Sequence, residues 1–265
     1  MVRDTGSRVG PTRKQHLSHD DFVKLRELAH ALPDDWLNDK IARAVALIRA
    51  ACAGHSAAYA WSGGKDSQAL RFVADRAGVE ECVLGMCDLE YPAFLRWVTD
   101  HMPERLHVIN TGLDLDWLAA HETMLFPQTA ETAAQWFQRI QHRAQQVFCR
   151  ARHIDVLLLG RRRDDGNFIG HDGHCAYVKQ DVTYVSPLAD WTHEEIFALI
   201  DRHRLPLPPF YDWPRGFRTG THCWPARQWC ESEAHGWREI DSIDPDIVTW
   251  AAQRLPGAHR FLNMR

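Results

Sequence analysis

Long hydrophobic runs are absent from this 265-residue chain, and so is an excess of positive charge. Nowhere do about eighteen apolar residues follow one another, so no transmembrane helix is predicted, and the first ten residues lack the apolar core of a secretion signal. The net charge of −4 gives no overall basic field for nucleic acid, although a local basic patch is compatible with it. We therefore expect a cytoplasmic protein.

The seven cysteines do not form the pattern of a secreted disulfide framework. Their number is odd, they are spread from Cys52 to Cys230, and no Cys-x-x-Cys pair occurs among them. Secreted domains stapled by disulfides carry an even number of cysteines at regular spacings. The thiols are therefore expected to be reduced.

What the sequence does contain is an alternation of short apolar runs with amphipathic stretches. Strands are predicted at residues 57–61, 81–86, 105–109 and 154–159. Helices are predicted from Phe22, over 35–53, 68–77, 92–101 and 130–153, and from Thr192 to about His203 after a Thr-x-x-Glu capping box. Strands that are apolar throughout and alternate with helices predict an α/β fold, a Rossmann-like doubly wound parallel sheet covered on both faces.

A glycine-rich turn, Ser62-Gly63-Gly64-Lys65-Asp66-Ser67, separates the first predicted strand from the next helix. Backbone N–H groups and the positive end of the helix dipole converge at such a junction and attract an anion. Gly63 and Gly64 permit close backbone approach, while the serines and Lys65 add hydroxyl donors and a positive charge. The residue order differs from both the Walker A loop and the G-x-G-x-x-G fingerprint.

This turn resembles the PP-loop signature of the adenine nucleotide alpha-hydrolase-like superfamily, and further motifs are similar to the phosphoadenosine phosphosulfate (PAPS) reductase family. These are Asn110-Thr111-Gly112, the arginine loop Leu159-Gly160-Arg161-Arg162-Arg163-Asp164-Asp165, the segment Val185 to Thr192, and the segment Leu205 to Asp212. Together they span roughly residues 55–225 in the order of the family.

The resemblance implies an adenine nucleotide, either ATP with Mg²⁺ or PAPS, lying across the carboxyl ends of the strands. Guanidinium forks in the arginine loop suit phosphate oxygens better than an ammonium does. Lys65, Asp66 and Arg162 are the predicted catalytic residues. Asp88 and Glu90 are either ribose contacts or a plain polar strand exit. The predicted nucleotide-binding residues are Ser62, Gly63, Gly64, Lys65, Asp66, Ser67, Gly160, Arg161, Arg162 and Arg163.

The chain departs from the reductase pattern near its end. Family reductases use a cysteine in a C-terminal Glu-Cys-Gly type motif, and this sequence has none. The paired cysteines of the iron–sulfur-carrying relatives are absent too, so no cluster of that kind is expected. Cys223, at the end of residues 216–223, is either a thiol near the nucleotide or a buried structural cysteine. The cluster 171–175, with His222 and Cys223, has zinc-type ligands but poorly matched spacing, so no metal is assigned and a substrate lid is the favoured interpretation.

Three parts of the chain are predicted: an N-terminal helical extension (1–54), a PP-loop nucleotide-binding domain (55–205), and an irregular, tryptophan-rich extension packed on it (206–265). The tryptophans of the last part are interpreted mainly as core residues. Stacking of a base, helped by Arg215, Arg218 and Arg227, is the alternative.

The favoured function is ATP-dependent adenylation of an acceptor, with reaction at the α-phosphate and release of pyrophosphate. The alternatives are a sulfonucleotide (PAPS or APS) reductase, a sulfur-transfer enzyme in nucleic acid modification, and a nucleotide-binding module without catalysis. The acceptor is not identified by the sequence, and a nucleic acid partner and a homodimer stay open.

Overall fold

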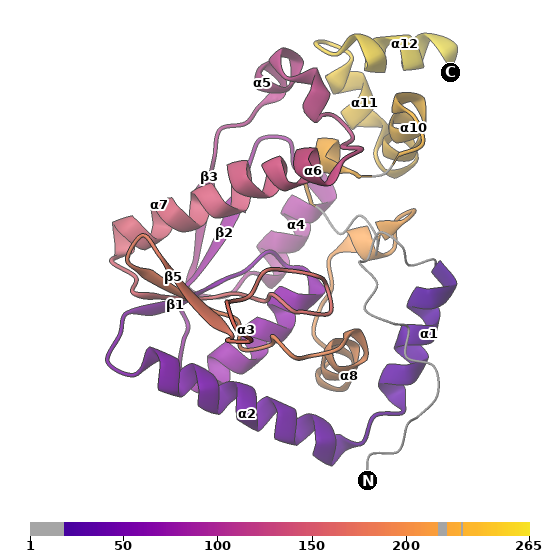
Figure 1. The fold of residues 1–265 in the computed structure, drawn as a ribbon. Coiled ribbons are helices and arrows are strands. Elements are labelled where there is room, and N and C mark those ends of the chain that lie inside the picture. The colour runs from indigo at the N-terminus through magenta and orange to yellow at the C-terminus, as the bar shows by residue number, and fades with distance from the viewer. Residues whose placement is uncertain (1–18, 217–221, 229) are drawn as a thin grey trace.

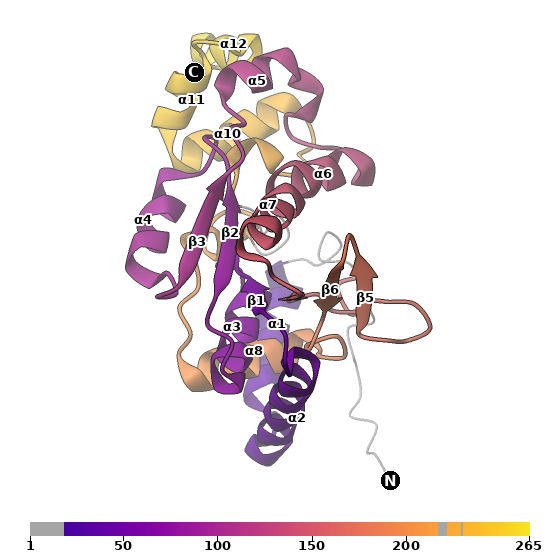
Figure 2. The ribbon, with the colours of Figure 1, turned by 90° about the vertical axis from the view of Figure 1, so that its left-hand side faces the viewer.

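The computed structural model describes residues 19–216, 222–228 and 230–265, and one mixed sheet organises them. Its strands run in the order β3-β2-β1-β4-β6-β5 and are parallel except for the antiparallel β5–β6 hairpin (Figure 2). The strands are β1 (Ala57–Ala60), β2 (Cys82–Met86), β3 (Leu106–Asn110), β4 (Val156–Leu158), β5 (Ala176–Lys179) and β6 (Val182–Val185). The predicted α/β, doubly wound architecture is confirmed.

Helices cover both faces of the sheet because successive strand residues point to opposite sides. Ala58, Val83 and Leu157 join a core beneath α7, whereas the neighbouring Tyr59 and Leu158 join the larger core on the other face. The helices of the central region are α3 (Lys65–Ala77), α4 (Pro92–His101), α5 (Leu115–Ala120), α6 (Ala130–Phe137), α7 (Arg143–Arg152) and α8 (His193–His203). The capping box predicted at Thr192 and Glu195 opens α8.

The helix predicted over residues 130–153 is present but interrupted. A π-helical turn, Gln138–His142, joins α6 to α7 and lies directly over β2. Gly85 permits this approach, because a Cβ there would stand 2.9 Å from the Ile140 carbonyl oxygen and 2.8 Å from the Ala144 Cβ. A glycine inside a strand thus marks the point where another backbone comes close.

The N-terminal helices are α1 (His19–His30) and α2 (Asp34–Cys52). Helix α2 packs on α3 and β4, while α1 packs on α8 and not on the sheet (Figure 1). Buried residues from both helices belong to the same core as the sheet. None of the helices within the described residues is both long and apolar enough to cross a bilayer.

The hairpin β5–β6 was not predicted; the residues just before it were interpreted as a lid. Its two-residue turn consists of Gln180 and Asp181, with φ of 51° and 62°. The sequence of such a turn is usually Asn-Gly or Asp-Gly, because two positive φ angles favour glycine. Here neither position is glycine, so the sequence lacked the usual turn signal.

The prediction of an irregular C-terminal extension was wrong for residues 233–264. These form α10 (Glu233–Ile243), α11 (Pro245–Ala251) and α12 (Pro256–Met264), which lie together beside α5 at one end of the molecule (Figure 1). Asp244 caps α11 and a proline opens both α11 and α12, so each break is also a helix start. Three short helices broken by proline give little continuous periodicity, which explains the error.

The tryptophans described in this extension lie partly in the core. Trp224 and Trp237 are fully buried, whereas Trp250 is 37% exposed and meets Trp224 edge-on. Arg215 and Arg227 do not stand ready to stack a base, because both bind the carboxylate of Glu239, with Arg215 Nη2 2.7 Å and Arg227 Nε 2.8 Å from Oε2. Arg218, which the sequence analysis also names, lies outside the described residues, and so does Trp229.

The clamp formed by Arg215 and Arg227 around Glu239 predicts that the stability of the fold depends on pH in the acid range. Burial raises the pKa of Glu239, but hydrogen bonds from Arg215 and Arg227 lower it by more, to about 2. A carboxyl whose pKa is depressed by folding contributes stability above its unfolded pKa and loses it as the pH falls toward the folded value. Glu239→Gln is therefore expected to lower the free energy of unfolding by about 1–3 kcal/mol at pH 7 and to flatten its fall between pH 4.5 and about 2.

Urea unfolding followed by circular dichroism across this pH range measures the effect. Glu231→Gln is the matched control, because the Glu231 side chain is 88% exposed. Equal pH profiles for the two variants would contradict the stabilising role of the clamp.

Candidate functional site

The glycine-rich turn leaves the sheet at its topological switch point. β1 pairs with β2 on one side and with β4 on the other, and residues 62–67 follow its carboxyl end. Crevices that bind ligands in open parallel sheets form at this kind of position. The chain folds this way because Gly63 adopts φ +73°, and a Cβ there would come within 2.6 Å of the Trp97 ring. Gly64 then becomes the N-cap of α3.

Hydrogen bonds within the turn fix its shape. Ser62 N–H donates to Ser67 Oγ at 3.2 Å, and the Ser67 hydroxyl donates to the Gly64 carbonyl at 2.9 Å. The N–H of Lys65, in the first turn of α3, donates to the hydroxyl of Tyr211 at 2.8 Å. Tyr211 belongs to the segment Leu205 to Asp212, so this segment closes over the start of α3.

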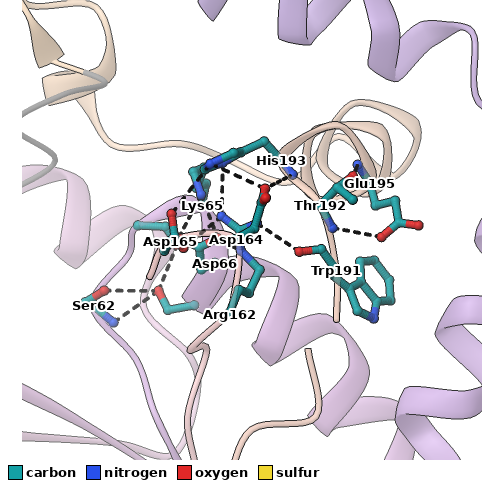
Figure 3. A network of polar contacts seen from close by, with 12 residues as sticks. Ser62, Lys65, Asp66, Arg162, Asp164, Asp165, Trp191, Thr192, His193 and Glu195 are labelled. Carbon is teal, nitrogen blue, oxygen red and sulfur yellow. Dashed lines mark hydrogen bonds and ion pairs between the residues drawn. The ribbon is translucent and has the colours of Figure 1, made fainter. Parts of the chain in front are cut away.

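The side chains of Lys65 and Arg162 are fully buried and meet at Asp66 (Figure 3). Lys65 Nζ lies 2.6 and 2.8 Å from the two Asp66 oxygens, and Arg162 Nε lies 2.8 Å from Oδ1. The Arg162 guanidinium also reaches Asp165 at 2.8 Å and the Trp191 carbonyl at 3.0 Å. This buried charge network, which also includes Asp164 and His193, joins the turn, the arginine loop and the start of α8.

Within this network the positive charges of Lys65 and Arg162 are balanced by the carboxylates that surround them. Burial lowers the pKa of the Arg162 guanidinium, but the carboxylates around it, Asp66 first, raise it by more, so Arg162 stays charged. Burial raises the pKa of Asp164 against the opposing effect of Arg162. With Lys65 and Arg162 facing three aspartates, the network is not a positive patch open to solvent. The catalytic role of Lys65, Asp66 and Arg162 stays a prediction.

The neighbouring residues of the arginine loop point in different directions. Arg161 binds His142 at 3.0 Å and the Tyr177 hydroxyl at 3.1 Å, which ties it to the π-helical turn before α7 and to the hairpin. Burial, followed by the charge of Arg161, lowers the pKa of His142 to about 4, so this imidazole is a neutral partner at pH 7. Arg163 is 38% exposed and pairs with Asp190. Gly160 lies against the turn, since a Cβ there would be 3.0 Å from the Asp66 carbonyl oxygen.

The polar residues after β2 divide into an exposed and a buried group. Asp88 accepts a hydrogen bond from the Asn110 side chain at 2.6 Å, in the exposed region where β2 and β3 end. Glu90 is buried and forms an ion pair with His222, so it is not available to a ribose in this arrangement. Burial raises the pKa of the Cys223 thiol, which is 1% exposed and lies 3.6 Å from Cys87 Sγ.

The described side chains do not gather into a metal site. In the part of the chain that the structure describes, no three His, Cys, Asp or Glu side chains are grouped so that they could hold an ion. Asp66 does not fit as a Mg²⁺ ligand here, because its two oxygens are bonded to Lys65 and Arg162. A metal ion at this carboxylate would have to replace buried cations.

Sequence reasoning missed three contributors to the site: Tyr211, Asp165 and His193. Tyr211 belongs to the family-like segment Leu205 to Asp212, for which the sequence indicates no role, and its contact with the turn joins residues 146 positions apart. His193 follows the capping residue Thr192, and its Nδ1 lies 3.0 Å from Arg162 Nη2. Only its position at the start of a helix could have drawn attention to it.

A family model described as the phosphoadenosine phosphosulfate reductase domain matches residues 56–224, more than half of the chain. The chain belongs to this family. The match includes the turn, the arginine loop and the Tyr211 segment, so the parts of the site come from the domain that defines the PAPS reductase family.

Solved structures with a similar fold include three at low identity. A PAPS reductase from Candida auris, in a phosphate complex, is 14% identical with a TM-score of 0.47, covering 74% of this chain and 92% of that one. An FMN adenylyltransferase from Candida glabrata is 11% identical with a TM-score of 0.44, covering 76% of this chain and 70% of that one. An NMN synthetase from Francisella tularensis is 14% identical with a TM-score of 0.46, covering 84% of this chain and 95% of that one. No curated protein matches the sequence.

The buried charge network predicts unequal effects at neighbouring arginines. Arg162→Met would leave three aspartates without their shared cation, and we expect the free energy of unfolding to fall by about 3–5 kcal/mol. Arg163→Met removes an exposed pair with Asp190 and exposed hydrogen bonds to the Gly173 and His174 carbonyls, and should change it by about 1 kcal/mol or less. Chemical denaturation at pH 7 measures both values. An equal fall in the free energy of unfolding in the two variants would contradict the special role of the buried network.

Proposed function

We propose that this protein binds ATP at the carboxyl edge of its sheet and uses it to adenylate an acceptor. The observation that carries the proposal is the turn Ser62–Ser67, a glycine-rich strand-to-helix junction at the switch point of a PAPS reductase family domain. The start of α3 directs backbone N–H groups and its dipole toward the same point, which favours phosphate oxygens.

In the proposed reaction an oxygen of the acceptor attacks the α-phosphorus, and the bond from that phosphorus to the bridging oxygen of the β-phosphate breaks. Pyrophosphate leaves and the adenylate remains on the acceptor. The turn would hold the leaving phosphates, with the N–H of Lys65 exchanging the Tyr211 hydroxyl for a phosphate oxygen. Mg²⁺ would enter as part of the MgATP substrate, since Asp66 is already bonded to two cations.

The buried charge network would act on this reaction by positioning. Lys65, Asp66 and Arg162 connect the first turn of α3 to the arginine loop and to α8, so they fix the direction in which the α3 N–H groups point. Asp164 and Asp165 keep Arg162 in place. A turn that is already in position has less reorganisation to undergo when charge develops on the leaving phosphates.

The division of the chain into an N-terminal extension (1–54), a nucleotide-binding domain (55–205) and a C-terminal extension (206–265) stays a prediction.

A sulfonucleotide reductase is the second candidate, because the family takes its name from that reaction. A reducing cysteine must become a thiolate and reach the sulfur. The burial of Cys223 and its raised pKa oppose this role. Thiol-dependent release of sulfite from PAPS would support the second candidate, and acceptor-dependent release of pyrophosphate from ATP would support the first. A nucleotide-binding module would bind ATP and release neither product.

Gly64 offers a variant that separates phosphate binding from folding. Its φ of −63° suits any residue, and a Cβ would have only ordinary contacts, 3.5 Å from Ser62 Oγ and from Tyr211 Oη. Aspartate is a good N-cap, so Gly64→Asp should keep or raise the thermal midpoint while its carboxylate repels phosphate. We expect MgATP binding to weaken by at least about tenfold.

Calorimetric titration of the reduced protein with MgATP, and separately with PAPS, measures this. Gly64→Asn is the matched control, because it caps α3 with the same shape and no charge. Equal affinity of both variants for MgATP would contradict the proposal that the phosphates bind at this turn. Binding of PAPS alone would move the assignment to sulfonucleotide chemistry, and binding of neither would overturn the proposed site.

A further inference from the structure

Two cysteines distant in sequence lie side by side next to the candidate site. The sulfur atoms of Cys87 and Cys223 are 3.6 Å apart, both residues are buried, and 136 positions separate them. Both are reduced in the structure. The adenylation chemistry uses neither of them, and the cysteines of the family reductases lie in a different motif.

Backbone pairing holds the two sulfurs at this distance. Glu90 and Cys223 form an antiparallel bridge, flanked by hydrogen bonds from Tyr91 N to His222 O (3.0 Å) and from Trp224 N to Leu89 O (3.1 Å). The Glu90 carboxylate adds a second connection, since it accepts from the Cys87 N–H at 3.0 Å and pairs with His222. A disulfide needs sulfurs about 2 Å apart, so they must approach by about 1.5 Å.

We propose that Cys87 and Cys223 form a reversible disulfide, a redox modification site that links the exit of β2 to the segment 222–224. The oxidant is a low-molecular-weight disulfide. The Cys223 thiolate attacks it and releases one small thiol; Cys87, losing its proton, then attacks the Cys223 sulfur and releases the second. Two S–H bonds of the protein are replaced by one S–S bond, and the two electrons reduce the small disulfide to two thiols.

In this scheme Cys223 reacts first, because it lines a small cleft together with Phe137, Gln141 and Gln228, and Phe137 is 48% exposed at the surface. The Cys223 side chain itself is only 1% exposed, so the oxidant reaches it when this cleft opens locally. Burial raises the pKa of the Cys223 thiol, so the thiolate is scarce at neutral pH. Oxidation should therefore be slow at pH 7 and accelerate as the pH rises, because only the thiolate attacks.

The bond would stiffen the wall of the candidate site. Phe94, in the first turn of α4, stacks on His222 with ring centroids 4.6 Å apart and also contacts the Phe210 ring at 6.0 Å. The Phe94 ring also lies against the turn, since a Cβ on Gly63 would be 3.3 Å from it. Cross-linking Cys223 to Cys87 would hold His222 against Phe94 and so against the turn, and the thermal midpoint of the oxidised protein should rise.

The test is to incubate the full chain with oxidised glutathione at pH 7 and pH 8.5, block remaining thiols under denaturing conditions, and map peptides by mass without reduction. We expect one cross-linked peptide pair joining Cys87 to Cys223, lighter than the sum of its parts by two hydrogens, forming faster at pH 8.5. It should vanish on treatment with dithiothreitol. Cys149→Ser, which removes a buried cysteine elsewhere, should leave the cross-link intact.

Cys87→Ser provides the complementary observation, since it should stop the reaction at a glutathione adduct on Cys223. The proposal is overturned if wild-type Cys87 and Cys223 are both recovered as blocked thiols after the partly exposed Cys175 has reacted fully. It is equally overturned if the wild-type protein keeps glutathione on either sulfur as its stable product. The wild-type measurement decides the matter even if the serine variant does not fold.

Discussion

The carboxylate of Asp66 is the group on which the arrangement of this site depends. It occupies the first turn of α3 and binds the buried cations of Lys65 and Arg162 at once. Taking two cations out of water is costly unless carboxylates and hydrogen bonds surround them, so Asp66, Asp164 and Asp165 must all stay in position around Arg162. Since these residues come from α3 and from the loop after β4, the network sets the distance between the two elements that border the switch point.

This arrangement changes how the turn can act on a ligand. A lysine and three arginines in sequence suggest a cationic pocket, but in the fold Lys65 and Arg162 are buried with carboxylates, and Arg161 and Arg163 bind other partners. What the turn would offer an anion is its backbone and the dipole of α3, since the Ser62 hydroxyl donates to Ser67 Oγ and the Ser67 hydroxyl to the Gly64 carbonyl. Tyr211 already uses one backbone N–H there. Nucleotide binding at this turn, as proposed, would be an exchange of hydrogen-bond partners.

The C-terminal part of the chain completes the domain. Residues of α10, α11 and α12 share one core with the sheet and with the N-terminal helices, and the pair of arginines around Glu239 joins the segment before α10 to that helix. The segment 222–224 returns to the exit of β2, where Cys223 meets Cys87. Segments far apart in the chain therefore meet at the carboxyl end of β2, where the Phe94 ring packs on both His222 and Phe210.

The sequence by itself determined the alternation of strands and helices, because apolar runs and helical periodicity are local signals. It also determined the turn at residues 62–67, the α8 capping box and the family, whose motifs are contiguous. Only the tertiary structure decided which charges are exposed, since the burial of Arg162 depends on the Asp66 carboxylate, which α3 brings to the arginine loop. It also decided the β5–β6 hairpin, whose turn lacks glycine, the three C-terminal helices, and the meeting of Cys87 with Cys223. Contacts between residues more than a hundred positions apart arise from folding, so no local pattern records them.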